Sequence, residues 1–263
     1  MIIEQIWTGN AYRNFNYLIV CPDTGEAMAI DPLDHEKCLG LAEAKGWTIT
    51  QVLNTHEHGD HTGGNSAVIE STGAKLLAHT NAKGKIPGMD RGLDAGDIIK
   101  VGSSIEIEAL DTPGHTMSHI CLLTRTDQPA LICGDTLFNA GAGNCHNGGH
   151  PNELFDTFAN LLSNLPDETL IYPGHDYMSG NLGFTLDREP DNTKAKSLLG
   201  EISDQDPNSA LVSTMALEKE INTFLRLRSP SVIAQLRESF PDLSDEPGPR
   251  EVFLKLRELR NSW

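Results

Sequence analysis

Four residues that are able to bind metal ions occur within six positions of the sequence: His56, His58, Asp60 and His61. They follow the apolar run at residues 52–54, which is typical of a strand. Residues two apart on an extended segment point the same way, so His56 and His58 can bind one ion together. Asp60 and His61 lie where the chain turns and can face a second ion. The segment therefore predicts a metal site at the end of a strand.

Three further candidate ligands, His115, Asp135 and His175, each follow the end of another apolar run. Each lies in a short turn that contains glycine, where side chains from different strands can converge at the rim of a sheet. A carboxylate has two oxygens, so Asp135 can bridge two ions. The remaining ligands then divide into two sets of three: His56, His58 and His115 for one ion, and Asp60, His61 and His175 for the other. Imidazole and carboxylate donors without thiolate favour two zinc ions, with iron or manganese as alternatives.

Residues 55–61 read Thr-His-Glu-His-Gly-Asp-His and resemble the Thr-His-x-His-x-Asp-His hallmark of the metallo-β-lactamase superfamily. The resemblance implies an αββα sandwich with the metals at one edge, formed by residues 1–177. It also implies that Asp60 and Asp135 are catalytic, since Asp60 would orient a hydroxide held between the two ions. Residues 178–263 would form a helical C-terminal section that binds substrate.

Within this superfamily the chain is most similar to glyoxalase II, the hydroxyacylglutathione hydrolases. The similarity rests on five segments: residues 134–138, 172–177, 188–192, 216–226 and 257–261. It implies a hydrolase that cleaves a small-molecule thioester such as S-lactoylglutathione. Three residues match positions that contact glutathione in the family: Tyr177, Arg257 and Arg260. Arg257 and Arg260 lie three apart in a helical pattern, so they share a face and could meet a carboxylate.

One segment departs from the family pattern. The family usually has Gly-Cys-Gly-Lys/Arg-Phe-Tyr/Phe-Glu-Gly after the bridging aspartate, whereas residues 141–149 read Gly-Ala-Gly-Asn-Cys-His-Asn-Gly-Gly. Asn144 replaces the cation and His146 replaces the aromatic residue. We therefore expect Asn144 and His146 to contact the substrate, but with different chemistry from the family's residues. Cys145, His146 and His150 could be read as a third metal site, but neighbouring loop histidines are more often simply loop residues.

Two other enzyme activities could use the same site in place of thioester hydrolysis: that of a lactonase and that of a β-lactam hydrolase. A third alternative is a ligand-binding protein of the same fold with only weak catalytic activity. A thiolate leaves without a general acid, whereas the nitrogen of an amide needs a proton donor. The sequence shows no obvious acid, which favours a thioester. All seven ligands are present, which argues against the weak binding protein.

Composition limits the partners and the location. There are 37 acidic and 20 basic residues, a formal net charge of -17, and this field repels nucleic acid. No apolar run approaches the roughly 20 residues that span a bilayer. Glu4 stands where a signal peptide needs basic residues. Five cysteines without a CxxC pair suit a reducing compartment. We expect a cytoplasmic protein with no membrane or nucleic-acid partner.

The elements that must position the site are short strands alternating with helices up to about residue 177. Strands are expected at residues 17–20, 27–30, 52–54, 75–78, 105–110, 120–124, 130–133 and 170–172. Helices are expected at residues 35–45, 61–71, 153–165, 215–227 and 250–260. After residue 177 the pattern predicts helices only.

Overall fold

Two six-stranded β-sheets lie face to face in the computed structural model, which describes residues 1–263. The first sheet has the order β1-β2-β3-β4-β5-β6, antiparallel from β1 to β3 and parallel from β3 to β6. Its strands are β1 (Ile2–Trp7), β2 (Phe15–Val20), β3 (Glu26–Ile30), β4 (Thr48–Leu53), β5 (Lys75–His79) and β6 (Arg91–Leu93).

The second sheet has the order β14-β13-β10-β9-β8-β7, and only β10 and β13 run parallel. Its strands are β7 (Ile98–Val101), β8 (Ile105–Asp111), β9 (Ile120–Thr124), β10 (Ala130–Gly134), β13 (Leu170–Pro173) and β14 (Ser213–Thr214). A small hairpin of β11 (Leu137–Phe138) and β12 (Gly141–Ala142) follows β10.

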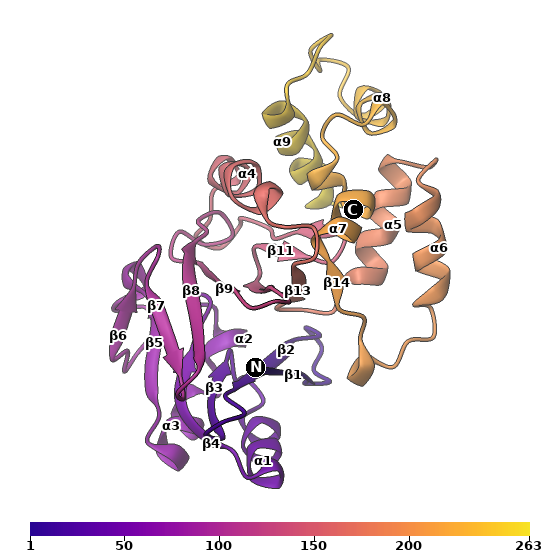
Figure 1. Cartoon of the computed structure of the whole chain (residues 1–263). Helices are drawn as coiled ribbons and strands as arrows, with labels where there is room; N and C mark the ends of the chain where they lie inside the picture. Colours follow the sequence, from indigo (N-terminus) through magenta and orange to yellow (C-terminus); the bar gives the residue numbers. More distant parts are fainter.

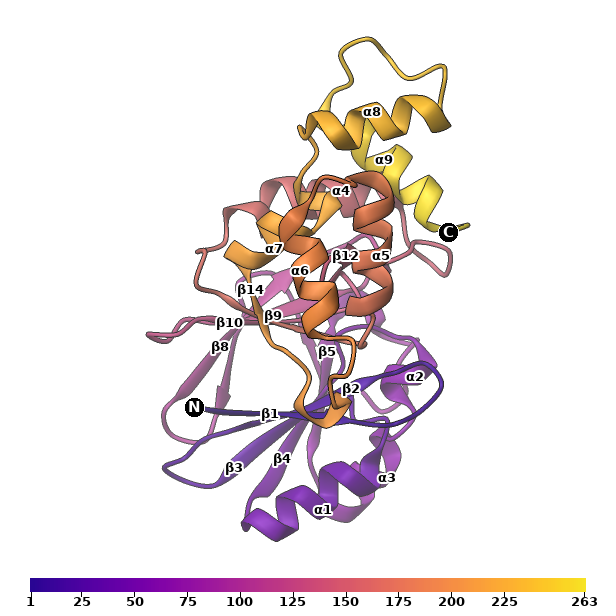
Figure 2. The ribbon, with the colours of Figure 1, turned by 90° about the vertical axis from the view of Figure 1, so that its right-hand side faces the viewer.

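Helices cover both outer faces of the paired sheets, which gives the expected αββα order (Figures 1 and 2). The first sheet is covered by α1 (His35–Lys45) and α3 (Asn65–Thr72). The second is covered by α4 (Pro151–Asn160), and its apolar core extends to the C-terminal helices α5 (Met178–Arg188), α7 (Met215–Ile221), α8 (Pro230–Ser239) and α9 (Pro249–Arg260). Helix α6 (Thr193–Glu201) packs on α5 and α7. Short helical turns are α2 (Gly59–Thr62), η1 (Thr80–Ala82), η2 (Leu162–Asn164), η3 (Pro207–Ser209) and η4 (Thr223–Leu225).

Side-chain alternation along the strands explains the layers. In β2, Tyr17 and Ile19 point into the core between the sheets, while Leu18 and Val20 pack under α1 and α3. The C-terminal helices share a core with the second sheet, because Phe224 and Phe253 pack in the same cluster as Leu131. The helical section is thus held to the sandwich by a continuous apolar core.

Several predicted elements need correction. The helix expected at residues 61–71 is two helices, because Gly63 and Gly64 separate α2 from α3. A Cβ on Gly64 would lie 1.8 Å from the Pro32 carbonyl oxygen, so only glycine fits there. The helices expected at 153–165 and 215–227 each end early and continue as a short 3₁₀ turn, η2 or η4.

The expectation of helices only after residue 177 is wrong, since β14 pairs with β13 at the edge of the second sheet. The apolar runs of the sequence also did not predict β1, β6, β7 or the short strands β11 and β12. Ile6 is the only buried residue of β1, so this edge strand lacks the apolar run that identifies an inner strand.

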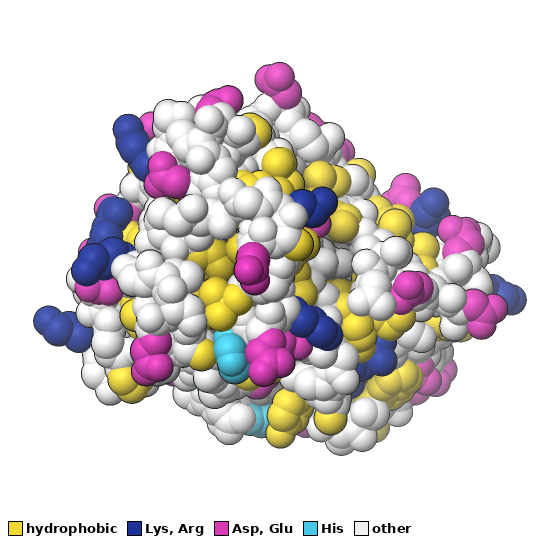
Figure 3. Space-filling model, turned by 90° about the horizontal axis from the view of Figure 1, so that it is seen from below, with side chains coloured by type: hydrophobic (Ala, Val, Ile, Leu, Met, Phe, Trp, Pro, Cys, Tyr) yellow, Lys and Arg dark blue, Asp and Glu magenta, His cyan; other side chains and the backbone are white.

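Lysine, arginine, aspartate and glutamate side chains are scattered over the face seen in Figure 3 and do not gather into one basic patch. A basic patch is the usual electrostatic mark of a nucleic-acid surface, and this face lacks one. None of the helices is long and apolar enough to cross a membrane.

Candidate functional site

The seven candidate ligands meet at one edge of the paired sheets, because each follows a strand that ends there. His56 and His58 follow β4, and Asp60 and His61 lie in α2 immediately afterwards. The other three follow strands of the second sheet: His115 after β8, Asp135 after β10 and His175 after β13. The structure therefore brings together every residue of the predicted metal set.

Short distances join the ring nitrogens in two groups. His58 Nδ1 lies 3.0 Å from His56 Nε2 and 3.1 Å from His115 Nε2. In the second group, His61 Nε2 lies 3.2 Å from His175 Nε2. His56, His58 and His115 form one potential metal-binding group, and Asp60, His61 and His175 form another.

Asp135 lies between the two groups. Its Oδ2 is 3.5 Å from His115 Nε2 and 3.2 Å from His175 Nε2, and its Oδ1 is 3.4 Å from His61 Nε2. This carboxylate thus lies within 3.5 Å of ring nitrogens in both groups, which is the position that a bridging ligand requires.

Backbone carbonyl oxygens fix the tautomers of three ligands. His58 Nε2 lies 3.0 Å from the carbonyl of Asn147, His115 Nδ1 2.7 Å from that of Asn144, and His175 Nδ1 2.7 Å from that of Tyr12. A carbonyl only accepts, so each of these nitrogens carries the hydrogen. The other nitrogen of each ring then directs its lone pair into the cluster, as metal-binding histidines do.

The donor set fits metal ions. Lone pairs of neighbouring rings face each other at 3.0–3.2 Å, and Asp135 Oδ1 is buried with no hydrogen-bond partner. Buried acceptors without a donor are costly, and a cation between them removes that cost. Gly174 leaves the space open, because a Cβ there would lie 2.3 Å from Asp135 Oδ1.

The directions of the pKa shifts of two histidines and of Asp135 suit a metal centre, whereas the pKa of His61 is raised, because the carboxylates of Asp135 and Asp31 outweigh its burial. Burial lowers the pKa of His56 well below its usual value and lowers that of His115, so both rings stay neutral. Burial opposes ionisation of Asp135, but the neighbouring His175 and His61 hold its pKa well below the usual range. Neutral imidazole and ionised carboxylate are the forms that bind metals.

Three residues that the sequence analysis missed support the ligands. Asp31 accepts hydrogen bonds from the Thr55 backbone N–H at 2.8 Å and from His61 Nδ1 at 2.9 Å. His119 stacks on His56 with ring centroids 5.1 Å apart, and its Nε2 accepts from the Asp135 backbone N–H. Asn14 donates to Asp60 Oδ2 at 3.2 Å. None of the three has a motif around it, and Asp31 only follows the end of an apolar run.

A pocket of about 190 Å³ adjoins the candidate metal ligands, and we call it the Arg257 pocket. Its lining includes all five predicted substrate contacts: Asn144, His146, Tyr177, Arg257 and Arg260. Two of them contact ligands directly, since the Tyr177 ring stacks on His175 at 4.8 Å and the Asn144 carbonyl bonds to His115.

The Arg257 pocket holds two cations without an acidic partner. Arg257 is only 4% exposed and donates to the carbonyls of Ala142 at 2.7 Å and Gly143 at 3.0 Å. Neither Arg257 nor Arg260 forms an ion pair within the chain. Burial lowers the pKa of Arg257 to about 10, so it stays charged at neutral pH. The pocket is therefore a local positive region in a protein whose net charge is -17.

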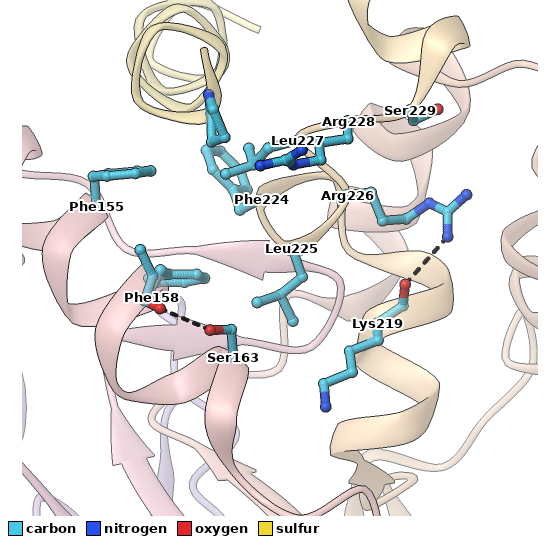
Figure 4. A pocket seen from close by; sticks show the side chains of 12 residues that line it. Phe155, Phe158, Ser163, Lys219, Phe224, Leu225, Arg226, Leu227, Arg228 and Ser229 are labelled. Carbon is cyan, nitrogen blue, oxygen red and sulfur yellow. Dashed lines mark hydrogen bonds between the residues drawn. The ribbon is translucent and has the colours of Figure 1, made fainter.

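A separate pocket of about 510 Å³ lies between α4 and η4, with Phe158 and Phe224 in its lining (Figure 4). Its cations are already paired, Arg226 with Glu189 and Lys219 with Asp167, except for Arg228 at the rim. It contains no candidate metal ligand. The ligand atoms of Cys145, His146 and His150 do not lie together as a potential metal-binding group, and His150 caps α4.

The metallo-β-lactamase superfamily model matches residues 13–175, so the chain is a member of that superfamily and has its fold. Membership implies a dinuclear site for divalent metal ions. The remaining residues, 176–263, match a second model, the hydroxyacylglutathione hydrolase C-terminus. Two relatives named hydroxyacylglutathione hydrolase match over 100% of both chains, at 70% identity in Polaromonas sp. (strain JS666) and 66% in Nitrosococcus oceani. The chain belongs to the hydroxyacylglutathione hydrolase family, and it is a hydrolase.

Solved structures agree on the fold. ETHE1 from Myxococcus xanthus has a TM-score of 0.69 at 26% identity and covers 99% of this chain and 98% of its own. The BLEG-1 B3 metallo-β-lactamase has a TM-score of 0.65 at 21% identity and covers 85% of this chain and 99% of its own. The αββα prediction and the similarity to glyoxalase II are both confirmed.

Proposed function

We propose that the chain hydrolyses thioesters of glutathione, or of a closely related acidic thiol, with S-lactoylglutathione as the reference substrate. We further propose zinc as the metal, held by the seven residues named above. The observation that carries the proposal is the contact between the Arg257 pocket and the metal ligands. Two unpaired guanidinium groups lie in the pocket, and its rim residues Asn144 and Tyr177 touch His115 and His175.

When bound, two divalent ions would lower the pKa of a bound water toward ~7, which supplies the nucleophile, and would polarise the substrate carbonyl. The protein positions the groups around that chemistry. Asp135 faces both ligand sets, with its Oδ2 3.5 Å from His115 Nε2 and 3.2 Å from His175 Nε2, and would be a ligand shared by both. Asp60 Oδ2 lies 3.6 Å from His61 Nε2 and 3.5 Å from His175 Nε2, and Asn14 holds it there. Asp60 can therefore accept a hydrogen bond from the attacking water and orient it.

The leaving group of a thioester is a thiolate, and the protein must bind it but need not protonate it. A thiolate departs without a proton, so the pocket's task is to hold the thiol carrier. Arg257 and Arg260 can each bind a carboxylate through charge-assisted hydrogen bonds. Burial raises the pKa of Tyr177, so its hydroxyl keeps its proton and can donate to the substrate.

A hydrolysis screen tests the proposal. The purified, metal-loaded protein is assayed with S-lactoylglutathione, the lactoyl thioester of N-acetylcysteamine, a lactone and a β-lactam. We expect the highest kcat/KM for S-lactoylglutathione, with the truncated thioester weaker because it lacks carboxylates. A lactone or a β-lactam with a higher kcat/KM than either thioester would overturn the proposal. The division at residues 177/178 and the cytoplasmic location stay predictions.

A further inference from the structure

A second pocket lies beside the Arg257 pocket, and we call it the Arg13 pocket. It measures about 410 Å³ and is lined by Arg13, Asp176, Ser179, Ser203 and Gln205, among others. Tyr177 and Arg260 line both pockets. The two cavities therefore meet at these two side chains, and Arg260 can reach a ligand in either.

The volume of the Arg257 pocket is too small to enclose a whole thiol carrier. Pockets that enclose small organic ligands usually measure about 300–1,000 Å³. The Arg257 pocket, at about 190 Å³, is below this range, while the Arg13 pocket adds about 410 Å³. A substrate with its acyl group at the metal ligands must continue beyond the Arg257 pocket, and Arg260 marks the boundary with the next cavity.

Charge and hydrogen bonding suit an anion in the Arg13 pocket. Asp176 is its only acidic lining residue, and it is neutralised by an ion pair with Arg13. Arg260 donates once, to Asn181 Oδ1 at 3.2 Å, and its other N–H groups have no partner in the chain. The net charge of the lining is therefore positive. Asp204 and Asp206 flank Gln205 in sequence but do not line the cavity.

The first turn of α5 adds donors to this wall. Its N-cap residue Tyr177 makes no capping hydrogen bond, and the first N–H bonded in the helix is that of Asn181. Ser179 and Gly180, which precede Asn181, line the pocket. Unpaired N–H groups and the positive end of the helix dipole favour a negative ligand group.

Arg13 is held in an unusual conformation at this wall. It has a φ of +60°, which is uncommon for a residue other than glycine. Its carbonyl accepts from the Asp176 N–H at 2.9 Å, and its guanidinium donates to the Asp176 carbonyl at 2.8 Å. The loop is thus fixed against the segment that follows the ligand His175, so the Arg13 pocket is built into the active-site edge.

We propose that the Arg13 pocket is a second substrate subsite, which binds a carboxylate at the end of the thiol carrier away from Arg257. The inference rests on the proposed thioesterase function and adds a second place at which the thiol carrier is held. One carboxylate lies at Arg257, and the other lies beyond Arg260 among the donors of the Arg13 pocket.

Charge changes at Gln205 test the subsite without touching the metal ligands. The side chain of Gln205 makes no hydrogen bond and is half-buried, so Gln205→Glu and Gln205→Lys should fold. We expect KM for S-lactoylglutathione to rise roughly threefold to fivefold in Gln205→Glu and to fall by a similar factor in Gln205→Lys. Gln235→Lys in α8 makes the same charge change outside both pockets and is the control.

Substrates with fewer carboxylates locate the effect. The N-acetylcysteamine thioester has none, and its KM should be the same in all variants. Two monoamides of S-lactoylglutathione each lack one carboxylate, either that of the glycine or that of the glutamate. The monoamide that keeps the distal carboxylate should respond to the charge at Gln205, and the other should not. Calorimetry with S-methylglutathione, which has both carboxylates and no free thiol, should show the same shifts in Kd.

Each outcome separates the two proposals. If no thioester is hydrolysed, the thioesterase proposal fails, while calorimetry still tests the subsite. If thioesters are hydrolysed but KM and Kd do not respond to the charge at Gln205, the subsite is wrong and the thioesterase proposal stands. An equal response with the N-acetylcysteamine thioester also overturns the subsite, because that substrate has no carboxylate to bind there.

Discussion

The Asp31 carboxylate accepts a hydrogen bond from His61 Nδ1 at 2.9 Å, and this bond turns His61 Nε2 toward the other ligands of its set. The same carboxylate accepts from the Thr55 hydroxyl at 2.7 Å, and that hydroxyl contacts His56 Nδ1 at 3.0 Å. One buried side chain thus orients a ligand in each of the two sets. Asp31 is a positioning residue, since it does not face the reacting atoms.

Removing the Asp31 charge should weaken metal binding without unfolding the site. We expect Asp31→Asn to lower the affinity for metal about tenfold to a hundredfold, the usual effect of losing an acceptor behind a ligating histidine. Competition with a chelator measures this directly. Asp127→Asn, which changes an exposed aspartate with no hydrogen bond or ion pair, is the control and should bind metal like the unmodified protein. Equal affinities for both variants would show that Asp31 does not position the ligands.

The proposed bridging role of Asp135 predicts how many metal ions the protein binds. The unmodified protein should carry close to two ions per chain, and Asp135→Ala should carry no more than one, because the carboxylate belongs to both sets and screens their mutual repulsion. Elemental analysis of metal-replete protein gives the answer. Two ions retained by Asp135→Ala, or a single ion in the unmodified protein, would contradict the arrangement.

The sequence predicted which seven candidate ligands meet at this edge, because each lies in a motif at the end of a strand. The pattern in residues 55–61 fixes four of them, and the apolar runs before His115, Asp135 and His175 indicate a shared edge. The residues that hold the candidate ligands in place could not be predicted in this way. Asn14 and Asp31 act through contacts with residues 46 and 30 positions away, and such pairing leaves no local pattern to read.

The fold was predicted best where strands are buried. Strands β2, β9 and β10 are buried along their whole length and were expected, whereas the edge strands β1, β6 and β14 were missed. Edge strands bury only part of their side chains, so their apolar signal is weak. The burial of Arg257 could not be predicted from the sequence either, because a charged residue near a chain end is usually exposed.

Glu189 provides a test of the helical section through pH. Burial raises its pKa, but hydrogen bonds from Arg226, Ser229 and Asn192 more than offset this, and the folded pKa lies below its usual value. A lowered pKa stabilises the folded state at pH values above the unfolded pKa, and that contribution is lost as pH falls through the folded pKa. Glu189→Gln should therefore lower the free energy of unfolding at pH 7 by roughly 2 kcal/mol, between the values for exposed and buried pairs.

The difference between Glu189→Gln and the unmodified protein should shrink as the pH falls below about 4.5, where the unfolded carboxyl is protonated. Denaturant titrations from pH 7 to pH 3 measure it. Glu238→Gln, at an exposed site in α8 without an ion pair, should show no difference at any pH. A Glu189→Gln difference that is independent of pH would rule out the ionic contribution.

Arg257 should act on binding and not on chemistry. Loss of a charged partner for a carboxylate costs ~1.5–3 kcal/mol, so Arg257→Gln should raise KM for S-lactoylglutathione about tenfold to a hundredfold with little change in kcat. Steady-state kinetics with Arg228→Gln, which removes an unpaired exposed cation elsewhere, supply the comparison. Truncating α9 is a poor test, because Phe253 and Leu256 belong to the core. Equal KM values for the two variants would contradict a substrate contact.

The altered loop at Asn144 and His146 should make S-lactoylglutathione a weaker substrate than it is for family members with a cation and an aromatic residue there. Both residues line the Arg257 pocket, and Asn144 also supplies the carbonyl that orients His115. A side-chain replacement keeps that carbonyl, so Asn144→Lys with His146→Tyr should leave the metal centre intact. The added cation should lower KM about tenfold, since a charged partner contributes ~1.5 kcal/mol or more, while kcat stays within about twofold. Metal content measured in parallel verifies the intact centre. If the double variant gains nothing on S-lactoylglutathione while it retains both ions, this loop does not set substrate choice, and recognition of the thiol carrier depends on the arginines alone.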